Sequence, residues 1–285
     1  MGSKRFRNKT CVYCGLEGGA NTADHVIARE FFLPAGRDNL PKVPACQECN
    51  TTKSRLEHYV LSVLLMGGVH ADAIEALATQ LGPRLANNDT LRRELAVGQR
   101  DRLIRQPDGS WATGMSVPFD GEKLAILCCY IAFGLAWHHW RLQIAPLAVA
   151  SANMFTGAGQ ANFEDMIARC EAGGRVEHTI GNGVFEYQGV HLRTNPRITL
   201  WQMKFFGGVE LGTYRQRGVT ARSLFVATND APDWIAARNT RRVPGRAPIG
   251  LGAADGEPAT SWHGPDVGEP SAQLDNGLQR HLGRR

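Results

Sequence analysis

CVYCG at residues 11–15 and CQECN at residues 46–50 decide the fold of the N-terminal part of the chain, because each contains a CxxC pair. In a CxxC turn the two thiolates converge on one tetrahedral cation, so two such turns complete a four-sulfur zinc site. Structural zinc contributes on the order of 10–16 kcal/mol in small zinc peptides, enough to hold a segment too short to build its own core. The sequence therefore predicts a structural Zn²⁺ site formed by Cys11, Cys14, Cys46 and Cys49.

Alternative interpretations of these cysteines are an iron–sulfur cluster, a redox pair or unrelated thiols. The chain has seven cysteines, and the other three, Cys128, Cys129 and Cys170, lie in apolar or helical contexts without a paired spacing. We expect these three to be buried thiols.

An aspartate–histidine pair, Asp24-His25, lies between the two CxxC pairs, where an apolar, β-branched run begins. Directly after the second pair, Asn50 opens a stretch of helical character that runs to about Met66. If zinc fixes both CxxC turns, the strand that carries Asp24 and His25 is drawn against the first turn of that helix. The sequence thus predicts a side-chain site in the groove between strand and helix.

The order of these motifs resembles the zinc-stabilised branch of the HNH endonucleases. The matching stretches are CVYCG (11–15), DHV (24–26) and VPACQECNTTK (43–53), and the resemblance covers about residues 11–60. It implies a ββα-metal module that hydrolyses DNA phosphodiester bonds and leaves 5′-phosphate and 3′-hydroxyl ends. One such site cuts one strand, so nicking is expected of a monomer. Duplex DNA is the expected substrate, and RNA is the alternative that shares the same chemistry.

The resemblance implies a role for each of three polar residues. His25 would be the general base, because an imidazole that is neutral near pH 7 can take a proton from water. Asp24 and Asn50 would hold a catalytic Mg²⁺ or Mn²⁺, since carboxylate and amide oxygens are hard ligands. The alternatives are a structural histidine, an orienting aspartate and a helix N-cap asparagine. Successive strand residues point to opposite faces, so we expect a bulge or turn at the Asp24-His25 pair.

Further polar residues near the motifs are additional candidates for the site. Lys53 and Arg55 are expected to contact phosphates, with a solvated helix surface as the alternative. Many family members have an asparagine about nine residues before the last signature residue, where this chain has Pro41. Asn39 is the candidate to orient His25 in its place. The basic N-terminal residues Lys4, Arg5, Arg7 and Lys9 could add sequence-independent backbone contacts, and His58 is expected to be a surface or packing residue.

The rest of the chain changes pattern twice. Residues 71–98 predict two helices with a break near Gly82-Pro83, and residues 121–142 and 163–172 predict two more. Residues 176–229 predict an antiparallel meander with tight turns at 181–183 and 207–208. The aromatic residues of these strands, Trp201, Phe205, Phe206 and Tyr214, are expected in the sheet core rather than stacked on bases.

The expected fold class is α+β, in three parts. Residues 1–66 form the HNH nuclease module with its zinc site. Residues 67–237 form a mixed helical and antiparallel-sheet domain for target recognition, for homodimer formation or for binding a partner protein. Residues 238–285, rich in Gly, Pro, Ala, Asp and Arg, are expected to be a disordered tail because they have few apolar residues to bury.

The bulk composition indicates a cellular location but does not identify a binding partner. The 285 residues carry a formal charge of +5 and a pI of about 8.9, which is compatible with a polyanionic partner but also common without one. The basic, polar start has no apolar signal region, so an intracellular, cytoplasmic location is expected. The longest apolar run, residues 124–137, is shorter than the roughly 20 residues of a membrane span. We expect a buried core helix there and no membrane association.

The leading interpretation is a metal-dependent endonuclease. The competing one is a non-catalytic zinc ribbon that binds nucleic acid or protein. Asp24, His25 and Asn50 discriminate between the two, since a purely structural zinc ribbon does not require them.

Overall fold

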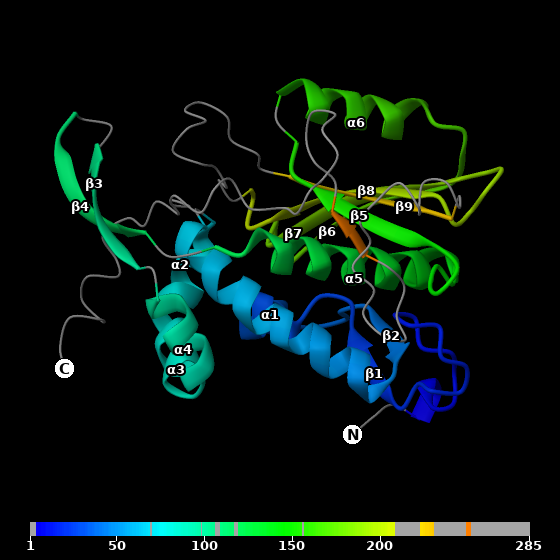
Figure 1. Cartoon of the computed structure of the whole chain (residues 1–285), viewed down its shortest axis with the longest axis horizontal. Coiled ribbons are helices and arrows are strands. Elements are labelled where there is room, and N and C mark those ends of the chain that lie inside the picture. The colour runs from blue at the N-terminus through cyan, green and yellow to red at the C-terminus, as the bar shows by residue number, and fades with distance from the viewer. Residues whose placement is uncertain are drawn as a thin grey trace.

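A computed structural model describes residues 4–68, 70–97, 99–105, 109–116, 119–155, 157–208, 223–230 and 249–251. It is a mixed α+β structure with antiparallel sheets, as predicted, and its four-cysteine cluster lies in the N-terminal part (Figure 1). Within the described part of the chain, no single helix has both the length and the apolarity to cross a membrane. The bent pair Gln47–Gly67 and Ala71–Ala86 meets both criteria only when its two helices are taken together.

The N-terminal part consists of two paired strands followed by a long helix. Strands β1 (Thr22–His25) and β2 (Lys42–Ala45) are antiparallel, and His25 pairs with Lys42 at the end of the ladder. Helix α1 (Gln47–Gly67) follows β2 directly, and its N-cap is Cys46, whose Sγ accepts a hydrogen bond from the Cys49 amide. This part also contains the short 3₁₀ helices η1 (Lys4–Phe6), η2 (Arg29–Phe31) and η3 (Pro34–Gly36).

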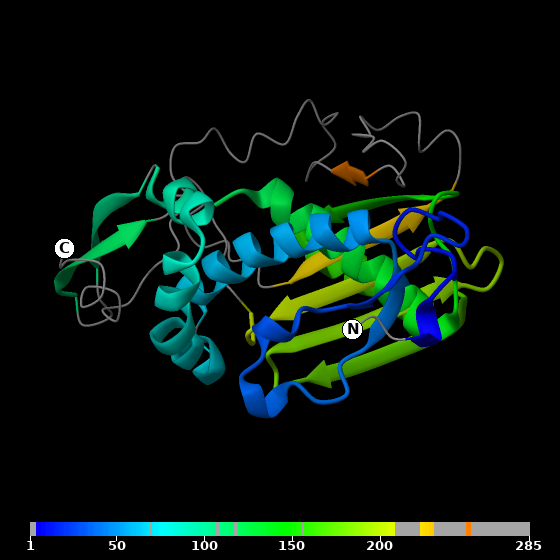
Figure 2. The same ribbon diagram turned by 90° about the horizontal axis from the view of Figure 1, so that it is seen from below.

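Helix α5 (Gly121–Trp140) is the centre of the fold. Its sequence is apolar on all sides, and such a helix must be covered all round. Asp120 caps its N-terminus by accepting hydrogen bonds from the amides of Glu122 and Lys123. It ends at Trp140, and its C-cap residue, Arg141, has a left-handed φ of 58°. Helix α5 lies against one face of the large sheet, and Figure 2 shows α1 crossing it on the side away from the sheet. The expected buried core helix is therefore confirmed.

The large sheet has the strand order β10-β5-β9-β8-β7-β6. Its members are β5 (Val149–Asn153), β6 (Ala172–Ile180), β7 (Phe185–Leu192), β8 (Thr199–Phe205), β9 (Leu224–Asn229) and β10 (Ile249–Leu251). The β6–β9 run is antiparallel, as the meander prediction required. The predicted turn at 181–183 joins β6 to β7, and Gly181, Asn182 and Gly183 all have positive φ.

Alternate residues of β8 pack on opposite sides of the sheet, as strand geometry requires. Trp201, Met203 and Phe205 join the core that contains α5, whereas Leu200 joins a smaller cluster under helix α6 (Gly157–Arg169). Phe206 is also buried, so the sheet-core prediction is confirmed for the three described members of the aromatic set, and Tyr214 lies outside the described residues. Helix α6 starts earlier than predicted.

The N-terminal part and the sheet share one hydrophobic core, which extends from Cys11 to Val226. Tyr13 meets Tyr130 of α5 edge to face at 5.1 Å between ring centroids. A Cβ on Gly134 would lie 2.9 Å from Val26, so α5 passes very close to the chain just after His25. The site region is thus held by α5 as well as by its own strands.

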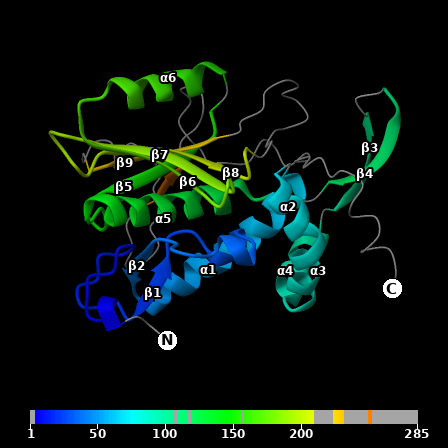
Figure 3. The same cartoon turned by 180° about the vertical axis from the view of Figure 1, so that it is seen from behind.

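Several elements differ from the predictions. The helical region contains α2 (Ala71–Ala76), a π turn η4 (Leu77–Leu81), α3 (Gly82–Ala86) and α4 (Asp89–Ala96). The break predicted near Gly82-Pro83 is wrong: a wider π turn precedes Pro83, a geometry that accommodates its ring and missing N–H, and the helices separate at Asn87-Asn88 instead. The hairpin β3 (Arg100–Arg105) and β4 (Trp111–Ser116) was not predicted, and it lies at the opposite end of the molecule from β1 and β2 (Figure 3).

The tail prediction is also corrected in part. Strand β10 pairs in parallel with β5, so Ile249–Leu251 have regular structure where disorder was expected. Residues 238–248 and 252–285 lie outside the described residues. Three cysteines lie outside the CxxC pairs. Cys128 and Cys129 are buried, as predicted, whereas Cys170 is only half-buried.

Candidate functional site

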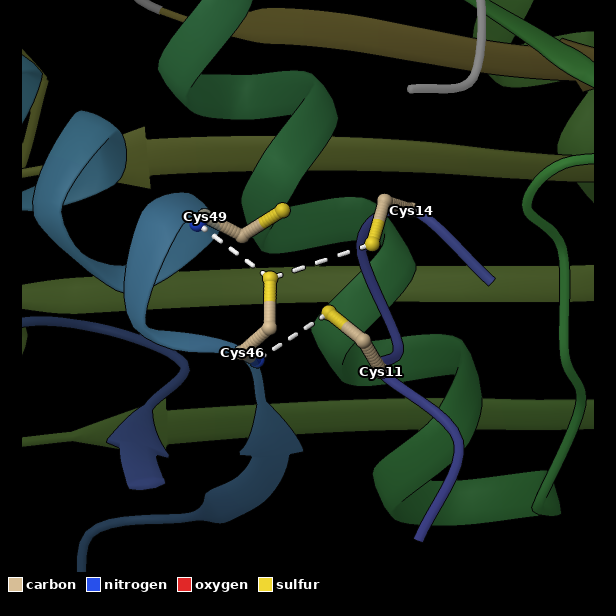
Figure 4. Close-up of side chains that lie close together, drawn as sticks. All are labelled: Cys11, Cys14, Cys46 and Cys49. Atoms are coloured by element: carbon tan, nitrogen blue, oxygen red, sulfur yellow. Dashed lines mark hydrogen bonds between the residues drawn. The ribbon is translucent and has the colours of Figure 1, made fainter. Parts of the chain in front are cut away.

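The two CxxC pairs converge as the sequence predicted. The four Sγ atoms all lie within 4.8 Å of one another and point to a common centre (Figure 4). The Sγ atoms of Cys14 and Cys46 are 3.9 Å apart. A tetrahedral site with metal–sulfur bonds of about 2.3 Å has sulfur–sulfur edges of about 3.8 Å, so the cluster could hold a metal ion with little movement.

The thiols are not equivalent before a cation binds. A hydrogen bond with Cys49 lowers the pKa of Cys11 to about 5, whereas burial raises the pKa of Cys14 to about 12. The Cys46 amide also donates to Cys11 Sγ at 3.3 Å. Four crowded sulfurs thus stabilise one thiolate by themselves, and a bound cation would favour deprotonation of the others. This chemistry fits a structural metal ion.

The first CxxC turn is held by the segment that follows α5. Gln143 Nε2 donates hydrogen bonds to the carbonyl oxygens of Cys11 at 3.1 Å and Val12 at 3.3 Å. Gly15 has φ 74°, and a Cβ there would lie 2.3 Å from Pro146 Cδ, so glycine is needed for the close approach. The four-cysteine cluster is therefore joined to the larger part of the fold by contacts between residues distant in sequence.

A cleft of about 360 Å³ opens between the end of β1 and the first turns of α1. Its wall contains eleven residues: Asp24, His25, Ala28, Arg29, Glu30, Gln47, Asn50, Thr51, Ser54, Arg55 and Glu57. The three residues predicted for chemistry, Asp24, His25 and Asn50, thus line one cleft. None of the four cysteines is among the lining residues, so the cleft is distinct from the sulfur cluster.

The Asp24-His25 pair lies where its strand ends. The β1–β2 register is regular up to His25, and the chain then bends at residues 26–27. No bulge occurs at the pair within β1 and β2; the end of the strand takes the place of the expected bulge or turn. Both side chains consequently reach the same cleft, although they are consecutive.

Asp24 is buried, and one of its two carboxylate oxygens forms both a hydrogen bond and an ion pair. Tyr13 Oη donates to Asp24 Oδ2 at 2.6 Å, and Lys53 Nζ lies 3.1 Å from the same atom. Burial, together with the Asp24 carboxylate, raises the pKa of Tyr13 well above its ordinary value. The phenol thus stays protonated and donates, and neither contact uses Asp24 Oδ1.

Lys53 is not where the sequence analysis expected it. Its side chain is 0% exposed, so it neither reaches a phosphate nor lies on a solvated helix face. The ammonium forms ion pairs with Asp24 and Glu57 and donates to the backbone carbonyl of His25 at 2.7 Å. A buried ammonium needs such partners because its desolvation costs several kcal/mol. Lys53 therefore fixes the strand end that carries Asp24 and His25.

Glu57 is a site residue that the sequence analysis missed. It lies one helical turn after Lys53, pairs with it, and lines the cleft. Burial raises the pKa of the Glu57 carboxyl to about 7, with Lys53 opposing the rise and Asp24 adding to it. For Lys53 the same two carboxylates outweigh burial, and its pKa is raised. The i, i+4 spacing of Lys53 and Glu57 was the available signal.

The other predicted residues have mixed outcomes. His25 is half-buried, and burial, followed by nearby Lys42, lowers its pKa, which favours the neutral imidazole. Asn50 lies inside α1, so the N-cap interpretation is wrong. Arg55 is exposed at the cleft. His58 is exposed, as expected, and does not line this cleft.

Asn39 lies in a turn with φ 57° and its side chain is exposed. It shares with His25 a second, larger cleft, but within the residues that the structure describes no hydrogen bond joins the two side chains. Lys53 contacts the His25 backbone instead, and the structure describes no contact through which Asn39 would orient the imidazole.

Replacing Lys53 by methionine is expected to lower the free energy of unfolding by about 3–5 kcal/mol, because the buried Asp24 carboxylate loses its cation and the Glu57 carboxyl must take up a proton. Methionine keeps most of the side-chain volume, so the effect reports charge rather than a cavity. Urea unfolding checks this, with Lys9→Met at an exposed lysine as the control, expected within about 0.5 kcal/mol of the wild type. Equal stability of both variants would contradict the buried ion-pair arrangement.

Comparison with known proteins finds no match, whether among family models, curated proteins or solved structures. The likeness to HNH endonucleases is carried by the motifs of residues 11–60 alone.

Proposed function

We propose that the chain is a metal-dependent HNH endonuclease that nicks DNA at the 360 Å³ cleft. The observation that carries the proposal is the position of Asp24, His25 and Asn50. These three residues, separated by up to 26 positions in sequence, line one cleft that is distinct from the four sulfurs. A zinc ribbon without catalysis would need only the sulfurs. Residues 11–60 would then be a ββα-metal module built from β1, β2 and the start of α1.

The proposed chemistry assigns each cleft residue a step. His25 takes a proton from the attacking water, and general-base help of this kind is worth about 10²–10⁴ in rate. Asp24 and Asn50 supply oxygen ligands for Mg²⁺ or Mn²⁺. When bound, the cation would stabilise the charge on the phosphate and on the departing 3′ oxygen. Lys53 acts indirectly, because it holds the Asp24 carboxylate and the His25 carbonyl in place.

The sulfur cluster has a structural role in this proposal. Four thiolates with tetrahedral spacing suit Zn²⁺, and with four protein ligands no coordination position is left open for substrate. Zinc would fix the first turn of α1 against the chain before β1. The helix face that carries Asn50 would thereby be set opposite Asp24 and His25.

The competing candidate, a non-catalytic zinc ribbon, is favoured by one observation. Asp24 is only 7% exposed, and its Oδ2 is already engaged by Tyr13 and Lys53. An aspartate held in this way is also consistent with a purely structural role. Cleavage assays separate the two candidates.

Purified protein is expected to convert supercoiled plasmid to open circles with Mg²⁺ or Mn²⁺ and not after brief EDTA treatment. The zinc content of the same samples is measured as a control. An unchanged zinc content after EDTA treatment would show that the structural cation has stayed bound. Parallel reactions with linear duplex, single-stranded DNA and RNA identify the substrate. No cleavage of any substrate with any of Mg²⁺, Mn²⁺ or Zn²⁺, in zinc-loaded protein, would contradict the proposal and favour the binding module.

A further inference from the structure

A second cleft, of about 590 Å³, lies next to the first, and we call it the basic cleft. His25 and Arg29 line both clefts. The wall of the basic cleft consists of Arg5, Phe6, His25, Arg29, Arg37, Asp38, Asn39, Leu40, Pro41, Lys42, Trp137, His138 and Arg141. His25, the proposed general base, thus lies where the two clefts meet.

Positive charge is concentrated on this wall. Five side chains are cationic, Arg5, Arg29, Arg37, Lys42 and Arg141, and one, Asp38, is anionic, which gives 5 − 1 = +4. The whole chain has a formal charge of only +5. His138 adds no charge near pH 7, because burial lowers its pKa. Such a focused field attracts polyanions.

Carboxylates of the described residues do not neutralise these cations by ion pairing. Among the residues that the structure describes, none of the five forms an ion pair with a carboxylate. Exposed arginines elsewhere do so, for example Arg92 with Asp89 and Arg169 with Asp165. The five cations of this wall outnumber its single carboxylate, that of Asp38, so they repel one another, and an external anion would relieve that repulsion.

Aromatic rings and backbone carbonyls hold several of these cations in place. The Arg141 guanidinium lies 4.3 Å from the centre of the Trp137 ring, and Phe6 meets the same indole edge to face. Arg37 Nε donates to the carbonyl of Phe32 at 3.0 Å. Three segments far apart in sequence, η1, residues 37–42 and the end of α5, therefore build one surface. Part of it lies outside residues 11–60.

We propose that the basic cleft binds the sugar–phosphate backbone of the nucleic-acid strand whose scissile phosphate lies at His25. This inference rests on the proposed function, because that function places the scissile phosphate at His25. It adds that the C-terminal end of α5 contributes to substrate binding. Contacts of this kind read no bases, so they predict affinity without sequence preference and with steep salt dependence.

Charge reversal on two sides of the cleft tests the proposal. Binding of a fluorescent duplex to zinc-loaded protein, without added Mg²⁺, is measured by anisotropy across a salt series. Lys42→Glu and Arg141→Glu are each expected to weaken binding by roughly tenfold at low salt and to reduce the salt slope by about 1. Arg92→Glu, at an exposed position outside the cleft, is the matched control and should bind as the wild type does.

The outcomes separate this inference from the proposed function. If the wild type nicks DNA but Lys42→Glu and Arg141→Glu keep its affinity and salt slope, the basic cleft is not the binding surface and the function stands. If the variants lose binding but the wild type cleaves nothing, the cleft stands and the function fails. If a reversed charge disturbs folding, the neutral variants Lys42→Gln and Arg141→Gln repeat the test. Binding of single-stranded DNA and RNA probes shows which kind of nucleic acid supplies the sugar–phosphate backbone.

Discussion

Cys49→Ser is expected to abolish zinc binding and to unfold the N-terminal part of the chain. Cys49 is buried, and its Sγ is one of four that lie within 4.8 Å of one another. A serine hydroxyl does not replace a thiolate on zinc, so a tetrahedral structural site loses one ligand. Structural zinc contributes on the order of 10–16 kcal/mol in small peptides, which matches the whole stability of many domains. We expect a loss of at least about 5 kcal/mol here, since other packing remains.

Zinc per chain by elemental analysis and thermal unfolding by circular dichroism measure this effect. A loss of that size should lower the melting temperature by roughly 10–20 °C in a chain of this length. Cys170→Ser is the matched control, because Cys170 is half-buried at the end of α6 and lies outside the cluster. It should retain one zinc per chain. Cys49→Ser with normal zinc content and an unchanged melting temperature would overturn the metal-site interpretation.

Local spacing explains which features could be predicted from sequence. A CxxC turn constrains its two sulfurs within four residues, so the cluster required only that the two turns meet. The uninterrupted apolar run of residues 124–137 predicted the buried helix α5 for a similarly local reason. The turn at 181–183 followed from glycines that adopt positive φ without strain.

Long-range contacts explain the features that were missed. Lys53 was assigned to phosphate because it shares a helix face with Asn50, but Asp24, its decisive partner, comes from a strand 29 residues earlier. The β3–β4 hairpin and the edge strand β10 are short and depend on pairing, which propensity describes poorly. The basic cleft combines η1, a loop and the end of α5, and no single motif encodes it.

His25→Ala is expected to reduce Mg²⁺-dependent plasmid nicking by about 10²–10⁴, because the attacking water loses its base. The fold should be retained. Lys53 binds the backbone carbonyl of His25, which alanine keeps, and the imidazole is only half-buried. A melting temperature close to that of the wild type would show that lost activity reflects lost chemistry. His58→Ala is the matched control, since His58 is exposed on α1 outside the cleft.

The rate of plasmid nicking by the wild type, His25→Ala and His58→Ala, at equal zinc content, is the most direct test of the proposed site. The account predicts that the wild type and His58→Ala nick at similar rates and that folded His25→Ala is nearly inactive. Nicking by His25→Ala at the wild-type rate would contradict it.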